Sequence, residues 1–173
     1  MEITTVDIGQ DSTFPGGETN FVTASHDPYS LEVDEEQGFL YWSNTNGKIL
    51  RKPLNGSGIT QTVYSNGNLT KITGLSIDLS RDPRRIFFCD YREERTFYKD
   101  VHTKAHELTE YMSSDPNMRD ISYFNGTLYW AKYDKPSAIA VMTEYDQNSP
   151  SFDIKETSEI EQPNQLLIIY GNP

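Results

Sequence analysis

The side chains best suited to covalent chemistry are one cysteine, Cys89, and two histidines that follow it, His102 and His106. A thiol becomes a nucleophile only when a neighbouring base or charge activates it, and an i, i+4 pair of histidines suits a metal ion when both lie on one helix. Cys89, however, follows Phe87 and Phe88 in an apolar run, where a thiol usually behaves as a small buried hydrophobic group. We therefore expect Cys89 to belong to the core, the histidines to lie in solvated loops or on sheet edges, and the chain not to be an enzyme.

Other motifs that carry chemistry are absent from the sequence. It contains no phosphate-binding glycine loop, no HExxH string and no paired-cysteine zinc spacing. Two acidic clusters lack the spacing of a calcium loop and are expected in solvated turns. These clusters are Asp34, Glu35 and Glu36, and then Glu156, Glu159 and Glu161. We therefore predict no catalytic residue, no metal and no cofactor.

A short aromatic block recurs along the chain, as LYWSN at 40–44, IFFCD at 86–90 and LYWAK at 128–132. The blocks begin 46 and then 42 residues apart, close to the roughly 40 to 50 residues of one β-propeller blade. A second phrase precedes each block and returns once more near the C-terminal end, with steps of 44, 46 and 45 residues. Its anchor residues are Leu31, Leu75, Ile121 and Leu166. Two phrases that share one period indicate a repeat architecture.

Each repeat contains short apolar runs separated by Gly, Asn, Asp and Pro clusters, which predicts four strands. In the first full repeat we expect them at about residues 29 to 34, 38 to 43, 47 to 54 and 59 to 64. The second strand is apolar at consecutive positions from Phe39 to Trp42, as expected when both faces of a sheet are covered. No helix is predicted. A β-sandwich also contains many short strands, but the fixed period favours an all-β propeller of four-stranded antiparallel blades.

The string GFLYWSN at 38–44, followed by KILRKPLNGS at 48–57, resembles the YWTD repeat of the low-density-lipoprotein receptor class B family. That family's pattern is an aromatic pair, a hydroxyl residue and Asp, then an Ile-x-Arg step and a Leu-Asp-Gly turn. The second block keeps the closing acid as Asp90 but has Cys89 in the hydroxyl position, and the third has Lys132 in place of the acid. The chain is therefore similar to a degenerate member of that family.

The resemblance implies a partial, open propeller of the six-bladed type. The expected units are the end of a blade at 1–24, three blades at 27–66, 71–112 and 117–158, and the inner strand of a final blade at 163–170. An isolated arc leaves apolar blade faces in water. We therefore expect the chain to be part of a longer protein, with neighbouring blades and a following EGF-like module. The alternative is that two copies associate to close a ring.

The resemblance also implies where a ligand docks, namely on the loops that enter the inner strands and the loops that follow the aromatic blocks. The candidate ligand-binding residues are Asp27, Lys71 and Asn117 in the first set of loops, and Asn44, Asn46, Arg92, Glu93, Tyr133 and Asp134 in the second. Aromatic and polar groups gathered where blades converge suit a protein-binding surface.

Together these features predict a non-enzymatic protein-binding module, part of the ectodomain of a lipoprotein-receptor-like endocytic or signalling receptor. The formal net charge of −11 weighs against nucleic acid and favours an extracellular protein ligand with a basic patch. One alternative is a calcium-dependent lactonase or esterase-like propeller, whose inner strands would offer Glu32, Asp34, Asp78, Asp120 and Asn164. Another is an extracellular-matrix scaffold of the nidogen kind.

Compartment signals are sparse. The segment Met1 to Gln10 has neither the basic start nor the apolar run of a signal peptide, and no stretch has the apolar length of a membrane span. Three glycosylation sequons begin at Asn55, Asn68 and Asn125, in expected turns and loops. If the receptor resemblance holds, the parent protein is extracellular or at the cell surface.

Overall fold

The computed structural model describes residues 2–5, 19–23, 28–65, 71–107, 109–112, 118–133, 138–143 and 151–156. These residues form strands and the turns between them, and they include no helix long and apolar enough to cross a membrane. The strands are β1 (Glu2–Thr5), β2 (Thr19–Thr23), β3 (Pro28–Asp34), β4 (Phe39–Asn44), β5 (Lys48–Pro53), β6 (Gln61–Ser65), β7 (Ile72–Asp78), β8 (Arg85–Asp90), β9 (Arg95–Asp100), β10 (Thr109–Met112), β11 (Met118–Phe124), β12 (Thr127–Lys132), β13 (Ala138–Thr143) and β14 (Ser151–Glu156).

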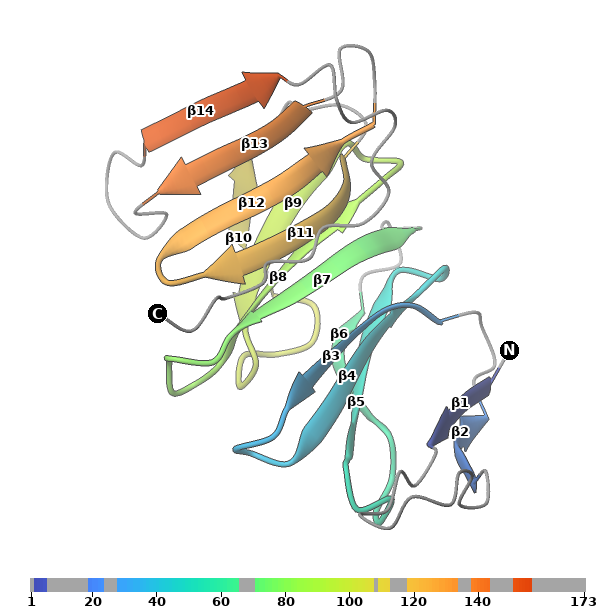
Figure 1. The fold of residues 1–173 in the computed structure, drawn as a ribbon. Coiled ribbons are helices and arrows are strands. Elements are labelled where there is room, and N and C mark those ends of the chain that lie inside the picture. Colours follow the sequence, from blue (N-terminus) through green and yellow to red (C-terminus); the bar gives the residue numbers. More distant parts are fainter. Residues whose placement is uncertain are drawn as a thin grey trace, which may run out of the picture.

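The strands build three four-stranded antiparallel sheets in chain order, which we call the first blade (β3–β6), the second blade (β7–β10) and the third blade (β11–β14). A two-stranded hairpin, β1–β2, precedes them. The inner strands β3, β7 and β11 lie side by side, with β7 between the other two (Figure 1). This arrangement confirms the predicted all-β, partial propeller of four-stranded antiparallel blades. The final inner strand expected at 163–170 lies outside the described residues.

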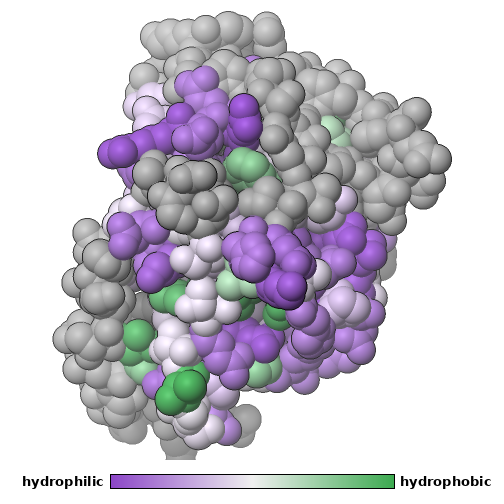
Figure 2. Space-filling model, turned by 180° about the vertical axis from the view of Figure 1, so that it is seen from behind, coloured by the Kyte–Doolittle hydropathy of each residue, from purple (hydrophilic) through white to green (hydrophobic). Residues whose placement is uncertain are grey.

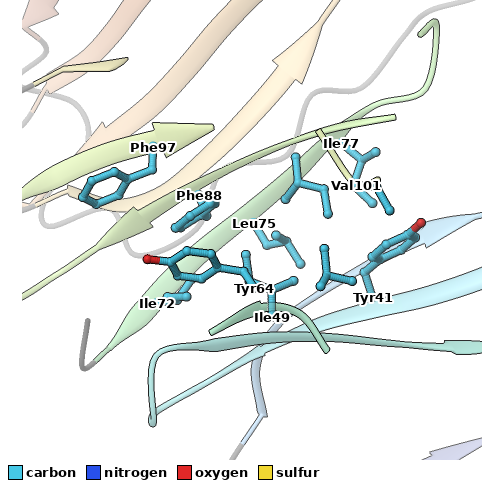
Figure 3. Packing of buried hydrophobic residues seen from close by; sticks show 11 residues of the cluster. Tyr41, Ile49, Tyr64, Ile72, Leu75, Ile77, Phe88, Phe97 and Val101 are labelled. Atoms are coloured by element: carbon cyan, nitrogen blue, oxygen red, sulfur yellow. The ribbon is translucent and has the colours of Figure 1, made fainter. Parts of the chain in front are cut away.

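The aromatic block of β8 packs the second blade against both of its neighbours. Tyr41 and Phe88 point into one core cluster between the first and second blades, whereas Phe87 joins another between the second and third. Figure 3 shows Tyr41 and Tyr64 of the first blade meeting Leu75 and Phe88 of the second. Because consecutive residues of a strand point to opposite faces, an aromatic pair serves two neighbouring blades at once.

Polar contacts and close backbone packing join the inner strands. The hydroxyl of Ser43 donates to the carbonyl of Ile72 at 3.0 Å and accepts from the N–H of Ser30 at 3.1 Å, so it bridges the first and second blades. At the next junction Gly74 lies against β11, where a Cβ atom added to it would meet the backbone nitrogen of Ile121 at 2.7 Å. The hydroxyl position of the repeat and this glycine therefore serve blade packing.

The outward face of the first blade is only partly covered. Trp42 and Leu40 pack against Phe21 of the β1–β2 hairpin and are buried. Their cross-strand partners on β3, Leu31 and Val33, remain 53% and 43% exposed. Among the residues coloured in Figure 2, most are hydrophilic, and the hydrophobic ones form small separate areas. Among the described strands, the inner strand of the first blade is therefore where large apolar side chains are exposed to water.

Candidate functional site

The end of the sheets where β3, β7 and β11 begin is shaped by one irregularity that all three blades share. Each inner strand carries one extra residue near its start relative to the second strand, between Pro28 and Leu31, between Ile72 and Gly74, and between Met118 and Asp120. A β-bulge of this kind turns the local side chains out of the regular alternation. The repeated bulge therefore re-aims residues at this end, which we call the bulge end.

Two side chains hold the turns that follow the aromatic blocks. Oδ1 of Asn44 accepts from the N–H groups of Asn46 and Lys48, both at 3.0 Å. Asp90 does the same in the second blade, because its Oδ1 accepts from the N–H groups of Arg92 and Glu93 at 2.9 Å. Since the side chain of Asn44 is only 3% exposed, its position serves the fold of the turn.

Asp90 also fixes the neighbouring entry loop. Its Oδ2 accepts from the N–H of Lys71 at 3.1 Å, and the carbonyl of Lys71 accepts from the N–H of Tyr91 at 3.0 Å. Lys71 and Tyr91 are thus held together by backbone bonds at the point where the second blade begins. These hydrogen bonds, most of them to the buried carboxylate of Asp90, fix the backbone that forms a platform for the side chains above it.

On this platform five side chains form a row that crosses all three blades, which we call the tyrosine–cation ladder. The ammonium of Lys71 lies 5.0 Å from the ring centroid of Tyr29 and 5.3 Å from that of Tyr91. The guanidinium carbon of Arg119 lies 3.9 Å from the centroid of Tyr91 and 4.3 Å from that of Tyr133. Tyrosine rings and cations therefore alternate along the row, with Tyr91 shared by both cations.

All four contacts fall within the roughly 6 Å range of cation–π attraction, which contributes about 0.5–1 kcal/mol at exposed sites and more when water is excluded. The ladder thus holds large aromatic and cationic side chains in fixed positions while leaving them accessible, since Tyr29 is 47% exposed and the other four are partly buried. Tyrosine and arginine are the residue types most often found at the energetic centres of protein interfaces.

The charge of the bulge end differs from that of the whole chain. Six of its eleven charged residues in the described ranges are basic, against a formal net charge of −11 overall. The basic ones are Lys48, Lys71, Arg92, Arg95, Arg119 and Lys132, and the acidic ones are Asp90, Glu93, Glu94, Asp120 and Glu156. The bulge end is therefore close to neutral, with a slight basic excess, whereas the chain as a whole is strongly acidic.

Two of the candidate ligand-binding residues, Lys71 and Tyr133, belong to the ladder. Arg92, Glu93 and Asn46 are exposed in the adjoining turns. The remaining candidates, Asp27, Asn117 and Asp134, lie outside the described residues.

Sequence reasoning missed Tyr29, Tyr91 and Arg119. A signal for Tyr91 was present, because Tyr91 and Tyr133 each follow the last residue of an aromatic block and lie 42 residues apart, the same step as the blocks themselves. Tyr29 and Arg119 also share a repeat position, two residues before the anchors Leu31 and Ile121. The bulges that bring these two into the row cannot be read from composition or periodicity.

The cysteine and the histidines do not form a reactive site in the described structure. Cys89 is fully buried in the core between the second and third blades, and burial raises the pKa of its thiol to about 12. Its polar contact is the hydroxyl of Thr73 at 3.5 Å. His102 and His106 are exposed in the turns after β9. Because a protonated thiol is a poor nucleophile, Cys89 acts as a core residue.

Of the described inner-strand carboxylates, Glu32 and Asp120 lie near each other, whereas Asp34 and Asp78 are bound by other partners. Asp34 is bound by Arg84 at 2.8 Å, and Oδ1 of Asp78 accepts from the N–H and hydroxyl of Ser80 at 3.0 and 2.6 Å. Within the described ranges no group of three or more His, Cys, Asp or Glu side chains could hold a metal ion. Asn164 lies outside those ranges.

Two of the three sequons lie in the described structure. Asn55 is exposed in the turn after β5, where its Oδ1 accepts from the N–H of Ser57 at 3.0 Å. Asn125 is exposed in the β11–β12 turn with a φ of 44°. Asn68 lies outside the described residues. Glycosylation at all three stays a prediction.

No protein-family model and no curated protein sequence matches the chain. Solved structures do match its fold. They include the WD40 β-propeller domain of Doa1 (TM-score 0.59, 12% identity, 72% of this chain and 40% of that one). The β-propeller domain of Myceliophteria thermophila Cps50 (Swd1) gives a TM-score of 0.54 and 11% identity over 77% of this chain and 40% of that one.

A luciferin-regenerating enzyme matches over 90% of this chain and 56% of its own, with a TM-score of 0.61 and 11% identity. The chain thus spans between two fifths and just over half of the length of these structures. At such low identity the matches establish the propeller fold and no particular repeat family. The protein is therefore of the β-propeller class.

Proposed function

We propose that this chain is a non-enzymatic protein-binding module of the β-propeller class and that the bulge end carries its ligand surface. The observation that supports this most strongly is the tyrosine–cation ladder. It draws Tyr29 from the first blade, Lys71 and Tyr91 from the second, and Arg119 and Tyr133 from the third. A contact surface that only the assembled blades create is what a binding propeller requires.

The local chemistry supports binding over catalysis. Tyrosine rings and cations offer stacking and ionic contacts to a ligand. The carboxylates of Asp34 and Asp78, which a calcium-dependent lactonase-like propeller would use, are engaged by Arg84 and Ser80. Esterase activity that depends on stoichiometric calcium would favour the enzyme alternative.

The finer proposal is that the module belongs to the ectodomain of an extracellular or cell-surface receptor of the lipoprotein-receptor kind. It is supported by the resemblance of 38–57 to the YWTD repeat and by the exposed positions of Asn55 and Asn125. The same observations support three further proposals equally. These are an EGF-like module next to the propeller, an endocytic or signalling role, and a matrix scaffold role. The net charge of −11 favours a protein ligand that also has a basic patch, which would face the acidic surface outside the bulge end.

The test is selection of a random peptide display library against the immobilised chain. Each enriched peptide is measured against the wild type, Tyr91→Ser and Lys104→Gln. Tyr91→Ser removes the ring shared by both cations, whereas Lys104 is 76% exposed in a turn after β9 and is not part of the ladder. We expect Tyr91→Ser to weaken binding at least about tenfold and Lys104→Gln to leave it unchanged, with circular dichroism confirming that both variants fold. Peptides that bind all three proteins equally would overturn the proposal.

A further inference from the structure

The cations of the tyrosine–cation ladder have no acidic partner within the described part of the chain. The ion pairs there belong to Arg84, Arg85 and Lys104, and none involves Lys71 or Arg119. Arg84 at the opposite end shows the usual arrangement, because Asp34 and Glu36 both bind its guanidinium. The ladder cations are therefore held by aromatic rings and retain their capacity to bind an anion.

Arg119 shows this most clearly. Its Nε is buried with no hydrogen-bond acceptor among the described residues, although most buried donors are paired. The guanidinium is planar and its N–H groups lie in that plane. With one ring at 3.9 Å and another at 4.3 Å from the guanidinium carbon, the ring faces cannot satisfy these N–H groups as acceptor oxygens would. The arrangement holds the guanidinium in one orientation and leaves its Nε–H without an acceptor.

We infer that the tyrosine–cation ladder is a carboxylate-binding surface that takes an acidic segment of a protein partner. Arginine binds carboxylates through two parallel hydrogen bonds, which are about twice as strong as neutral ones. The tyrosine rings on either side offer apolar contact to the methylene groups of glutamate and to neighbouring side chains. This inference rests on the proposed function and specifies its ligand.

The charge distribution favours a short acidic segment over an extended polyanion. The bulge end carries a slight excess of basic residues, but the chain as a whole carries a formal net charge of −11. Exposed charges are screened beyond about 8–10 Å in physiological salt. A few glutamates bound on the ladder are therefore attracted mainly by the charges of Lys71 and Arg119. A nucleic acid strand would extend beyond the ladder, where the acidic residues of the chain would repel its phosphates.

The test is fluorescence anisotropy with three short labelled peptides of Tyr and Gly that differ only in carrying Glu, Gln or Lys. We expect the full chain to bind the Glu peptide most tightly, with affinity falling as salt rises. Arg119→Gln and, separately, Lys71→Gln should each weaken Glu peptide binding at least about tenfold. Arg119→Lys keeps the charge without the planar fork and should give an intermediate loss, and Lys104→Gln should give none.

Equal or tighter binding of the Gln or Lys peptide would overturn the inference, as would displacement of the Glu peptide by an equal charge of single-stranded oligonucleotide. Undiminished Glu peptide binding in both Arg119→Gln and Lys71→Gln would also overturn it. The display selection separates this failure from failure of the proposed function. Neutral or basic peptides that bind in a Tyr91-dependent way would uphold a protein-binding ladder and refute its acidic ligand.

Discussion

The guanidinium of Arg84 binds the carboxylate of Asp34 at 2.8 Å across the junction of the first and second blades, although 50 residues separate them in the chain. Both side chains are almost inaccessible to water, at 5% and 0% exposed. Arg84 also donates to the carbonyls of Leu79 and Arg81 and to Glu36. This cluster fastens the end of the blades opposite the tyrosine–cation ladder.

The Asp34–Arg84 pair predicts a loss of stability in acid. Burial opposes ionisation of Asp34, but the hydrogen bonds and charge of Arg84 outweigh it and lower the pKa of the carboxyl below its usual 3.8. The stabilisation is therefore present above that value and is lost as pH falls through the lower folded pKa. Asp34→Asn should lower the free energy of unfolding by about 3 kcal/mol near neutral pH, and the difference from the wild type should become smaller in acid. Urea unfolding of both proteins at several pH values measures this difference. A difference that does not change with pH, or an equal loss in the exposed control Glu35→Gln, would show that the Asp34–Arg84 pair is not the cause.

The environment of Glu32 leads us to expect a loss of stability as pH rises, the opposite of the effect at Asp34. Burial, with Asp120 nearby, raises its pKa from 4.5 to about 7 despite a hydrogen bond with Ser76. Because the folded pKa lies above the unfolded one, the contribution of Glu32 to stability is full below pH 4.5 and is lost as pH rises through about 7. Glu32→Gln should therefore be more stable than the wild type above about pH 7, and the two should converge below about pH 5. Chemical denaturation at several pH values decides this, and a variant less stable at high pH would contradict it.

Leu31 and Leu75 occupy the same repeat position but different environments. Leu75 is 2% exposed in the core between the first and second blades, whereas Leu31 is 53% exposed on the uncovered face. Leu75→Ala should cost about 2–5 kcal/mol through lost burial and a cavity. Leu31→Ala should cost less than about 1 kcal/mol. Thermal unfolding of the pair tests the difference, and equal losses would mean that the face of β3 is covered in solution.

Gly74 predicts a steric limit at the second junction. A Cβ atom there would lie 2.7 Å from the Ile121 nitrogen and 2.9 Å from the Cys89 sulfur, so β7 and β11 must separate to admit it. Gly74→Ala should destabilise by about 1–3 kcal/mol or more. Gly126→Ala is the matched control, because Gly126 has a positive φ of 80° and no atom within 4 Å of the added carbon, so it should cost only about 1 kcal/mol. A smaller loss for Gly74→Ala than for the control would argue against this close approach.

The blades could be predicted because each repeat carries the same pattern of apolar runs and turn residues. Strands expected at about 38 to 43 and 47 to 54 are found at Phe39–Asn44 and Lys48–Pro53. The aromatic pair was interpreted as buried on both faces, and Trp42 and Tyr41 are both fully buried. Apolar runs and turn residues are signals that can be read from a short stretch of sequence, and in this chain they recur once in each repeat.

The site could be predicted only in part. Lys71 and Tyr133 were placed on the ligand face because loop position follows from the repeat. Arg119 lies in the ladder because of the β-bulge in β11. A single extra residue in a strand cannot be detected from the hydropathy pattern of the sequence. Asn44 was assigned to the ligand surface, because a polar residue at a strand end can either contact a ligand or stabilise the following turn. In the structure its side-chain oxygen accepts two backbone N–H groups of that turn.

The central claim is that the bulge end binds protein ligands, and amide chemical-shift mapping tests it most directly. The isotope-labelled chain is titrated with the peptide most enriched in the display selection. We predict that the largest shifts fall at Lys71, Tyr91 and Arg119 and that they disappear in Tyr91→Ser. Shifts confined to Leu31 and Val33, or to the turns around Asp34 and Arg84, would contradict the account and move the binding surface elsewhere.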